Sequence, residues 1–360
     1  MNIHDLATRP SPSQRTRDDA SPVVSSRIRL ARNLRDHPFP GRAGEAERTA
    51  VWENLRDHLL DLSECAPALA LALDGVRDLD RMILFERHLI SREQAEGRAG
   101  SGLVLRTDEQ VALMVNEEDH LRMQALRPGL DLAGAWQDLD AVDSALEARV
   151  RFAFSARLGY LTACPTNVGT GMRASVMLHL PGLALIGEVG PIINGLGKIG
   201  LAVRGLWGEG TEATGHLYQI SNQITLGVRE TEVLDRLEAI VREVVEHEIN
   251  ARQRLTDSQP SVVEDRAGRA WGILTRARIL PSQEALDLLS ALRLGLDLGI
   301  LPQVSRKAVD ELMVLTQPAH LQVRFQAVLS PRERDERRAD LVRQRLQETS
   351  EPSPPRKDAR

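Results

Sequence analysis

Cysteine and aromatic residues are scarce in this chain of 360 residues. Its two cysteines, Cys65 and Cys164, cannot make the disulfide framework of a small secreted protein, so we expect a cytoplasmic protein. Only 3% of the residues are aromatic, which leaves few side chains for stacking on single-stranded nucleic acid. The core must therefore be built mainly from Leu, Ala and Val.

Long apolar runs and a strong excess of one charge are also missing. No uninterrupted apolar stretch reaches the roughly 20 residues that a membrane-spanning helix needs. The N-terminal residues lack the apolar segment of a signal peptide. The net charge of -5 argues against electrostatic binding to nucleic acid or to anionic membranes. With 42% hydrophobic residues, the composition is that of a globular protein with one large and one smaller domain.

The pattern of apolar residues predicts an α+β fold. Helical spacing marks residues 46–62, 139–156 and 231–255, and strand-like runs mark residues 81–89, 103–116, 175–180, 201–204 and 215–220. The strict alternation of strands and helices that a doubly wound sheet requires is not seen. We expect residues 1–22 to be a disordered lead and residues 23–254 to form the mixed domain.

The character of the sequence changes after residues 257–260. Three Leu- and Ala-rich segments with helical spacing follow, at residues 262–280, 282–295 and 305–315, and Pro281, Gly299 and Pro302 separate them. We therefore predict a small all-helical C-terminal domain over residues 262–347. Residues 348–360 are rich in proline and charge, which is typical of a disordered tail.

Arginines recur in polar segments that suit phosphate binding. They are Arg27, Arg29, Arg122, Arg173 and Arg204. Arginine keeps its charge near neutral pH, and its planar fork matches a pair of phosphate oxygens. Several arginines converging on one site would imply a polyanionic ligand. The carboxylates and the thiol nearby would then suit a cationic second substrate.

Each of these segments, taken alone, also fits a plainer structural role. Residues 116–122 fit a solvated turn after a strand, Cys164 fits a small buried side chain, and residues 204–212 fit a hairpin connection. Each segment also has a functional alternative. Residues 116–122 would place Glu118 and Arg122 in a cleft, Cys164 would be a reactive thiolate beside arginines, and residues 204–212 would form a glycine-containing loop that closes over a ligand.

Three familiar motifs are considered and rejected. Residues 195–200 match G-x-G-x-x-G, but the segment before them is not a clear strand, and residues 201–203 after them look like one. A dinucleotide-binding site needs the opposite order, and Ile199 stands where a Walker loop needs Ser or Thr. Ala251 stands where a zinc protease helix needs its second His, so we predict no metal site.

Taken together, the polar segments resemble the phosphagen (guanidino) kinase family, and within it the bacterial protein-arginine kinases of the McsB type. The matching motifs lie, in order, at residues 25–33, 87–91, 116–120, 164–171, 173–176 and 218–222. The resemblance covers about residues 23–254 and implies a catalytic domain built on an antiparallel sheet flanked by helices.

The resemblance also implies roles for individual residues. Glu118 matches the catalytic glutamate, Glu209 a second acidic residue on a mobile loop, and Cys164 the reactive cysteine. ATP, carried with Mg²⁺, would be bound by Ser26, Arg27, Ile28, Arg29, His88, Arg122, Arg173, Ala174, Ser175, Val176, Met177, Arg204, Gly205 and Gly208. The arginines would neutralise the phosphates, while two carboxylates would grip an acceptor guanidinium and take up its proton.

The sequence departs from the small-molecule members of the family in two places. Those enzymes carry a helical domain ahead of the Ser-Arg-Ile-Arg motif, which here starts at Ser25, so we expect that domain to be missing. An acceptor site without it would be open and would suit an arginine displayed on another protein. Leu206 and Trp207 also stand where small-molecule members often have a further basic residue.

Near the C-terminus, residues 334–339 match an R-D-x-x-R-A motif. By resemblance, Arg334 and Arg338 would hold the phosphoryl group of a phosphoarginine, Asp335 its guanidinium, and Ala339 would complete the motif. The pocket would allow allosteric feedback activation. Taken alone, the charge run fits a solvated helix face.

The resemblance therefore implies a kinase that transfers the γ-phosphate of ATP to arginines in proteins. It would mark repressors or unfolded proteins for regulation or degradation in a stress response. The implied partners are a zinc-finger activator protein, a heat-shock repressor, an AAA+ protease and a second copy of the chain in a homodimer. The alternatives are a non-catalytic phosphoarginine-binding adaptor and a kinase of a free guanidino compound.

Overall fold

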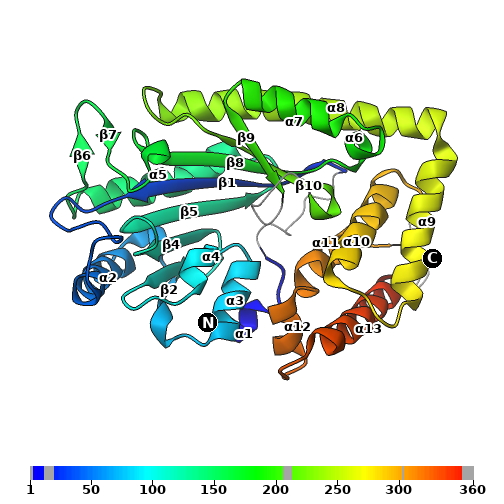
Figure 1. The fold of residues 1–360 in the computed structure, drawn as a ribbon, viewed down its shortest axis with the longest axis horizontal. Coiled ribbons are helices and arrows are strands. Elements are labelled where there is room, and N and C mark those ends of the chain that lie inside the picture. Colours follow the sequence, from blue (N-terminus) through cyan, green and yellow to red (C-terminus); the bar gives the residue numbers. More distant parts are fainter. Residues whose placement is uncertain (1–2, 12–19, 206–212, 302–303, 351–360) are drawn as a thin grey trace, which may run out of the picture.

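The structure is a computed structural model that describes residues 3–11, 20–205, 213–301 and 304–350. An eight-stranded antiparallel sheet within these residues crosses the molecule, and helices α9 to α13 gather at one end of it (Figure 1). The strand order is β2-β3-β4-β5-β1-β8-β10-β9. The strands are β1 (Val23–Arg32), β2 (Ala68–Ala72), β3 (Gly102–Arg106), β4 (Val111–Val115), β5 (Leu121–Pro128), β8 (Met172–His179), β9 (Leu201–Gly205) and β10 (Leu217–Asn222). A separate hairpin joins β6 (Phe154–Ser155) to β7 (Gly159–Tyr160).

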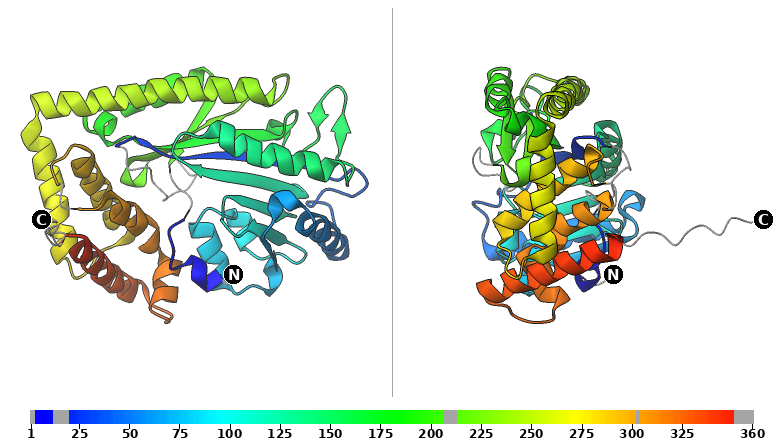
Figure 2. Two further views of the ribbon diagram at one scale, coloured as in Figure 1. Left: turned by 180° about the vertical axis from the view of Figure 1, so that it is seen from behind. Right: turned by 90° about the vertical axis from the view of Figure 1, so that its right-hand side faces the viewer.

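One face of the sheet is covered by helices that pack on its apolar side chains. The covering helices are α2 (Glu45–Leu60), α5 (Leu132–Glu147), α6 (Pro181–Leu185), α7 (Val189–Lys198) and α8 (Glu230–Ser258). Figure 2 shows α5 and α8 lying across the back of the sheet. Alternate residues of each strand supply this core, among them Ile28 and Leu30 of β1 and Ala174 and Val176 of β8, all fully buried. The predicted α+β fold with a helix-flanked antiparallel sheet is confirmed.

Among the described residues, α10 (Ser282–Asp297) lies against the other face of the sheet at the end of β8, where Ser290 contacts His179. A second group of helices covers this face near β3 and β4. There, α1 (Ile3–Leu6), α3 (Asp78–Glu86) and α12 (Pro318–Arg324) share one apolar core with the strands. Ile3 and Leu6 are buried in it, so the expectation of a disordered lead is wrong for residues 3–11.

Glu86, at the end of α3, fastens α12 to this part of the sheet. Its carboxylate accepts hydrogen bonds from the backbone N–H groups of Ala319 (2.8 Å) and His320 (3.2 Å), and lies 2.7 Å from Nδ1 of His320. Such bonds satisfy the exposed N–H groups at the start of a helix. The contact joins the C-terminal helices to the segment that leads to His88.

The C-terminal helices have their own Leu-rich core. They are α9 (Pro260–Arg276), α10 (Ser282–Asp297), α11 (Arg306–Leu315), α12 and α13 (Pro331–Ser350). Pro260, Pro318 and Pro331 each occupy the first position of a helix, where the N–H that proline lacks would have no partner. The three predicted segments correspond to α9, α10 and α11, whereas the starts of α12 and α13 at Pro318 and Pro331 were not predicted.

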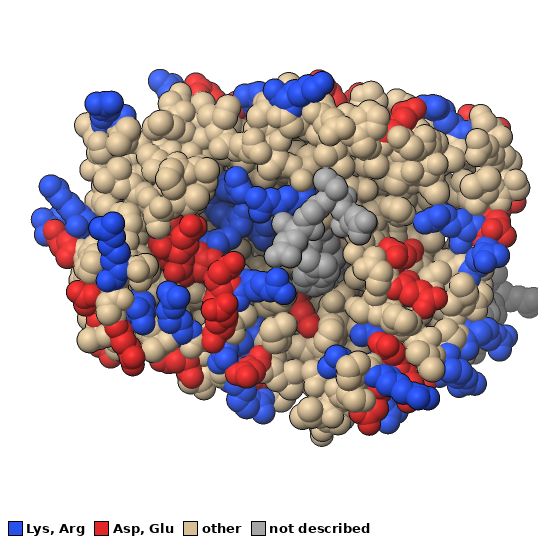
Figure 3. Space-filling model, viewed as in Figure 1, with Lys and Arg blue, Asp and Glu red and all other residues tan. Residues whose placement is uncertain are grey.

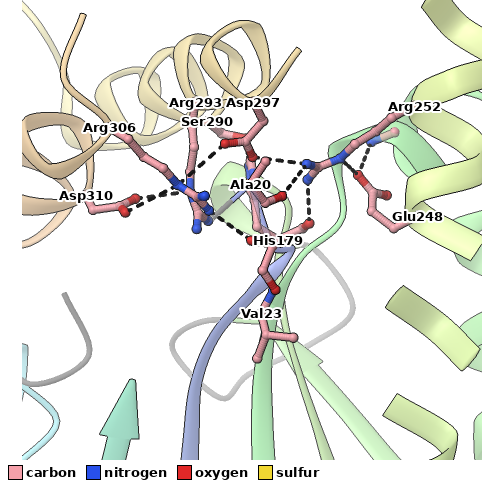
Figure 4. A network of polar contacts seen from close by, with 12 residues as sticks. Ala20, Val23, His179, Glu248, Arg252, Ser290, Arg293, Asp297, Arg306 and Asp310 are labelled. Atoms are coloured by element: carbon pink, nitrogen blue, oxygen red, sulfur yellow. Dashed lines mark hydrogen bonds and ion pairs between the residues drawn. The ribbon is translucent and has the colours of Figure 1, made fainter. Parts of the chain in front are cut away.

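A buried network of charged groups joins the C-terminal helices to the sheet (Figure 4). Arg252 of α8 donates to Glu248 (2.6 Å) and to Asp297 of α10 (3.0 Å), and also to the backbone oxygen of His179 at the end of β8. The His179 ring lies 2.8 Å from the hydroxyl of Ser290. Burial and neighbouring arginines lower the pKa of His179 well below its ordinary value, so the ring is neutral. Strand β8 is thereby anchored to α10 at the end away from Arg173.

Two segments differ from their predicted structures. Residues 81–89, predicted as a strand-like run, belong mostly to α3, because a short apolar run cannot by itself distinguish a strand from a buried helix. The helix predicted at residues 139–156 begins at Leu132, where Asp131 caps it by accepting from the N–H of Gly134 (2.9 Å), and it ends at Glu147. The first four residues of the rejected glycine motif lie on α7 and β9 follows the motif, so the strand predicted after it is confirmed.

Candidate active site

The register of the sheet places the five arginines on its uncovered face. Arg29 of β1 lies opposite Arg173 of β8, and Arg204 of β9 lies opposite Gln219 of β10. Residues opposite one another in an antiparallel pair share a face, while successive residues alternate. Arg122 of β5 lies opposite Ala31, two positions from Arg29 and therefore on the same face.

A cleft of about 740 Å³ opens over this face. Four arginines of its lining, Arg29, Arg122, Arg173 and Arg204, form what we call the basic part, and Glu117, Glu118 and Asp119 form the acidic part. Cys164 also lines the cleft, close enough to Arg173 to influence its charge. Figure 3 shows a hollow lined by basic side chains, with a group of acidic side chains at its border. The structure thus brings together the predicted catalytic Glu118 and Cys164 with four of the predicted phosphate-binding arginines.

The basic part of the cleft is electrostatically crowded. Burial, together with Arg122 and Arg173, lowers the pKa of Arg27 to about 10. Burial and the same neighbours lower the pKa of Arg29 well below its ordinary value. The pKa of Arg173 is also lowered, by burial and by Arg204. Like charges held this close destabilise one another, so an anion bound among them would be strongly favoured.

His88 lies at the edge of the basic region in a left-handed conformation, with φ at 60°. Gln124 of β5 holds its backbone by donating to its carbonyl oxygen (2.6 Å). Burial and the charge of Arg27 lower the pKa of His88 to about 4, so its ring is neutral. A neutral ring suits an aromatic base better than a phosphate.

The acidic part of the cleft is the turn between β4 and β5. Burial disfavours ionisation of Glu117, but the ion pair with Arg122 (2.5 Å) outweighs it, and the pKa of Glu117 is lowered. The pKa of Glu118 is raised, by burial first and then by the charges of Asp119 and Glu117. The carboxylate of Asp119 accepts from Asn33 (2.5 Å) and from the backbone of Ala163 (2.6 Å). Glu118 is thus a carboxylate with increased affinity for a proton.

Cys164 begins the loop that faces this turn. Its half-exposed sulfur lies 3.0 Å from the hydroxyl of Thr166. The loop is fixed from behind by Thr225, whose hydroxyl lies within hydrogen-bonding distance of the backbone oxygens of Thr166 (3.0 Å) and Val168 (2.7 Å). Gly169, with φ at 114°, lies so close to this backbone that a Cβ there would meet the oxygen of Thr225 at 2.2 Å. The thiol is therefore held on the cleft wall by a rigid loop.

Several residues of the predicted nucleotide site do not line the cleft. The side chains of Ile28, Ala174 and Val176 point into the core on the opposite face. The hydroxyl of Ser26 donates to Gly129 and accepts from the N–H of Asp131, so it supports the start of α5. Arg27, His88, Ser175, Met177 and Gly205 are also outside the lining, although the register places Arg27, Ser175 and Met177 on the arginine face. Glu209 and Gly208 lie outside the described residues.

Sequence reasoning assigned no role to some residues that line the cleft. They include Glu117, Asp119, Arg92, Glu93, Thr166 and Asn167. Glu117 and Asp119 flank Glu118 in the same acidic run, which was an available signal. Arg92 and Glu93 belong to α4 (Arg92–Ala95), and only tertiary packing brings this short helix to the cleft.

The R-D-x-x-R-A motif lies in the first half of α13. Arg338 is almost fully buried and donates to the backbone oxygens of Thr316 (2.9 Å) and Leu280 (2.8 Å) as well as to Asp335 (2.5 Å). Arg334 is less buried and donates to the oxygen of Leu329. Ala339 is buried in the helical core. Arg338 thus connects α13 to the end of α11 and to the segment before α10.

The described residues contain no group of three or more His, Cys, Asp and Glu side chains placed to hold a metal ion. None of the helices in the described ranges is long and apolar enough to cross a membrane.

Comparison with known proteins agrees with this geometry. A family model for the ATP:guanido phosphotransferase C-terminal catalytic domain matches residues 50–251, and one for the protein-arginine kinase McsB C-terminal domain matches residues 260–357. The protein-arginine kinase of Symbiobacterium thermophilum is 48% identical over 327 residues, covering 90% of this chain and 93% of the relative. That of Moorella thermoacetica is also 48% identical, with the same coverage of both chains.

Solved structures show the same fold. The substrate-free duplicated taurocyamine kinase from Schistosoma mansoni matches with a TM-score of 0.58 and 25% identity, over 79% of this chain and 42% of that one. Lombricine kinase matches with a TM-score of 0.57 and 25% identity, over 71% of this chain and 76% of that one. The resemblance inferred from the motifs is confirmed. The chain belongs to the ATP:guanido phosphotransferase family, and within it to the protein-arginine kinases.

Proposed function

We propose that this chain transfers the γ-phosphate of ATP to the guanidinium groups of arginines in other proteins. The observation that carries the proposal is the division of one cleft into a basic and an acidic part. A polyanionic donor fits the first and a cationic acceptor the second. The two would meet where Arg122 and Glu118 adjoin.

In this proposal the arginines hold the phosphates of the nucleotide. Arg29, Arg122 and Arg173 would neutralise the charge that spreads over the oxygens of the transferring group. Each is fixed on a strand of the central sheet, so little reorganisation accompanies the reaction. Arg27 and the neutral His88, just outside the cleft, would lie toward the adenosine.

Glu118 would orient and deprotonate the acceptor. A protonated guanidinium is a poor nucleophile because its electrons are delocalised. As the nitrogen–phosphorus bond forms, the bond from the γ-phosphorus to the β,γ-bridging oxygen breaks, its electron pair leaves with ADP, and a guanidinium proton passes to Glu118. The raised pKa of Glu118 makes it a better acceptor for that proton. By family resemblance Glu209 would supply a second carboxylate.

Cys164 would give the guanidinium a further partner. It lines the same cleft as Glu118 and Arg173. A thiolate there would add a negative contact for the acceptor.

Mg²⁺ would enter as part of the substrate. Since the described residues offer no metal cage, the ion would be held by the nucleotide phosphates and water, as is usual for this cation. Bound there, it would supply additional neutralisation of the phosphate oxygens.

We also propose a domain division, a regulatory site and a cellular role for this chain. The chain would divide into a catalytic domain at residues 23–254 and a helical domain at residues 262–347. The helical domain would bind phosphoarginine through the motif that contains Arg334, Asp335, Arg338 and Ala339, and would provide a homodimer contact. The enzyme would act in the cytoplasm under stress on a heat-shock repressor or unfolded proteins, with a zinc-finger activator and an AAA+ protease as partners.

The proposal is tested by incubating the full chain with Mg-ATP and an unfolded Arg-rich protein, with free arginine in a parallel reaction. Mass spectrometry under non-acidic conditions, which preserve the nitrogen–phosphorus bond, detects the product. We expect phosphate on protein arginines and little on free arginine. Phosphate on free arginine alone would make the chain a small-molecule guanidino kinase. Phosphoarginine binding with no transfer, even after potential activator proteins are added, would favour the adaptor.

A further inference from the structure

A second, smaller hollow of about 340 Å³ adjoins the acidic side of the cleft. We call it the side recess. Its lining includes Glu93, Glu117, Glu118 and Arg122, which also line the main cleft. The two spaces therefore meet at the carboxylate that would hold the acceptor. Whatever occupies the side recess lies next to the phosphorylated group.

The wall of the side recess carries more carboxylates than arginines. Glu93 and Glu96 are exposed, and neither carboxylate forms an ion pair within the ranges that the structure describes. Of the two arginines on the wall, Arg122 is already paired with Glu117, while Arg98 is exposed to solvent. A phosphate group would be repelled by the unpaired carboxylates, whereas a cation would be attracted.

Asn116, on the wall of the side recess, has a buried side-chain oxygen that lacks a hydrogen-bond donor among the described residues. This residue of the recess wall is 2% exposed and has φ at 55°. Its side-chain nitrogen donates to the backbone oxygens of Arg48 and Gly100, each at 2.7 Å, which fixes the orientation of the amide. Its side-chain oxygen then has no partner in the described part of the chain. A buried acceptor without a donor is rare in folded proteins.

We propose that the side recess binds a second basic side chain of the acceptor protein, close in sequence to the arginine that is phosphorylated. The inference rests on the proposed kinase function and deepens it. In an extended chain, side chains two residues apart project from the same face, roughly 6.5 to 7 Å from each other. One basic group can thus reach Glu118 while its neighbour enters the recess. The kinase then selects arginines in basic sequences.

The test uses short peptides with a single arginine. One neighbouring position at a time, from three residues before the arginine to three after it, carries Lys, Gln or Glu. For each position, kcat/KM with Lys is divided by kcat/KM with Gln. We expect a ratio of about two to five at one or two positions, the size of a partly exposed ion pair, and a decline toward one as salt is raised.

Glu96 is the residue to change, because it lines only the recess and is exposed. Glu96→Gln should bring the ratio toward one, and Glu96→Lys should reverse the preference in favour of the Glu peptide. Glu246→Gln, on an exposed part of α8, is the matched control and should keep the wild-type ratio. Circular dichroism spectra would verify that each variant is folded.

The outcomes separate this inference from the proposed function. Phosphorylation of every peptide with a ratio near one at all positions would overturn the recess but not the kinase. A preference that persists in both Glu96 variants would place the selecting group elsewhere and would likewise overturn it. No phosphorylation of any peptide or protein would instead contradict the proposed function.

Discussion

Arg29 and Arg173 lie directly opposite each other on the adjacent antiparallel strands β1 and β8, with both side chains on the uncovered face of the sheet. Like charges in opposite positions of a sheet destabilise it. The free protein therefore carries a local electrostatic cost at the proposed nucleotide site, which a bound polyphosphate would relieve. Affinity for the nucleotide and stability of the empty protein are thus opposed at this pair.

Removing one arginine of this pair should therefore weaken nucleotide binding and stabilise the nucleotide-free protein. Arg173→Ala should weaken nucleotide binding about 10- to 100-fold, the effect of losing one charge-assisted hydrogen bond. It should also raise the melting temperature of the nucleotide-free protein by about 1 to 4 °C, since a repulsive charge is removed. Isothermal titration and calorimetry measure the two effects. Arg276→Ala, at an exposed position of α9, is the control and should change neither. Unchanged nucleotide affinity in the Arg173 variant would remove this residue from the phosphate site.

Glu118→Gln separates chemistry from nucleotide binding. The amide keeps the shape of the side chain but cannot accept the guanidinium proton, so phosphoryl transfer should fall at least about 100-fold. Nucleotide affinity should stay within about twofold, because the arginines that would bind the phosphates are untouched. Rapid-quench assays and nucleotide titration provide the two numbers. Weak nucleotide binding with normal turnover would contradict the role assigned to Glu118.

Asp119→Asn should shift the acid limb of the kcat/KM profile to lower pH. Glu118 must be ionised to act as a base, so activity rises as the pH rises through its pKa. The charge of Asp119 contributes to raising that pKa, and removing the charge lowers it. One side-chain oxygen of Asp119 accepts from both Asn33 and Ala163, and asparagine retains such an oxygen. A limb that stays in place or moves to higher pH would show that another group controls it.

The motif on α13 gives a prediction about stability. Arg338→Ala would leave the buried backbone oxygens of Thr316 and Leu280 without donors and should lower the free energy of unfolding by roughly 2 to 4 kcal/mol. Arg334→Ala should cost less than about 1 kcal/mol, since it loses one bond from a less buried side chain. Urea denaturation measures both.

The Arg334 variant is therefore the better test of phosphoarginine binding. If Arg334 contacts this ligand, its loss should reduce binding without unfolding the helical core. Arg334→Lys, which keeps the charge but not the planar fork, should recover part of the affinity. Equal destabilisation by the Arg334 and Arg338 variants would contradict the structural difference between them.

Parts of the site followed from the sequence because local rules decide them. Strand β1 was not predicted, although the alternation of Arg27 and Arg29 with Ile28 and Leu30 was an available signal for a strand with one polar and one apolar face. The acidic turn at Glu118 follows a buried strand, which is where clefts often form. Motif resemblance alone did not separate residues that face the cleft from residues that face the core. It grouped Ile28, Ala174 and Val176 with the nucleotide-binding arginines, whereas strand geometry directs their side chains into the core.

The burial of Arg338 could not be predicted from the sequence. The run from Arg332 to Arg338 is charged on every side, so no periodicity indicates which arginine faces inward. The choice depends on unpaired carbonyls at Thr316 and Leu280, which belong to other elements. Glu93 lines the cleft for a similar reason, since it is distant from Cys164 in sequence and only the fold brings the two to the same cleft.

The sequence by itself determined the fold class, three of the C-terminal helices, the basic and acidic groups of the site and the family. These follow from composition, from periodicity along one element and from motifs in a fixed order. Only the tertiary structure decided that four arginines share a cleft with Glu118 and Cys164, which other carboxylates line that cleft, and that Arg338 supports the core. Those outcomes depend on strand register and on packing between distant segments, which set the distances and the burial on which charge interactions depend.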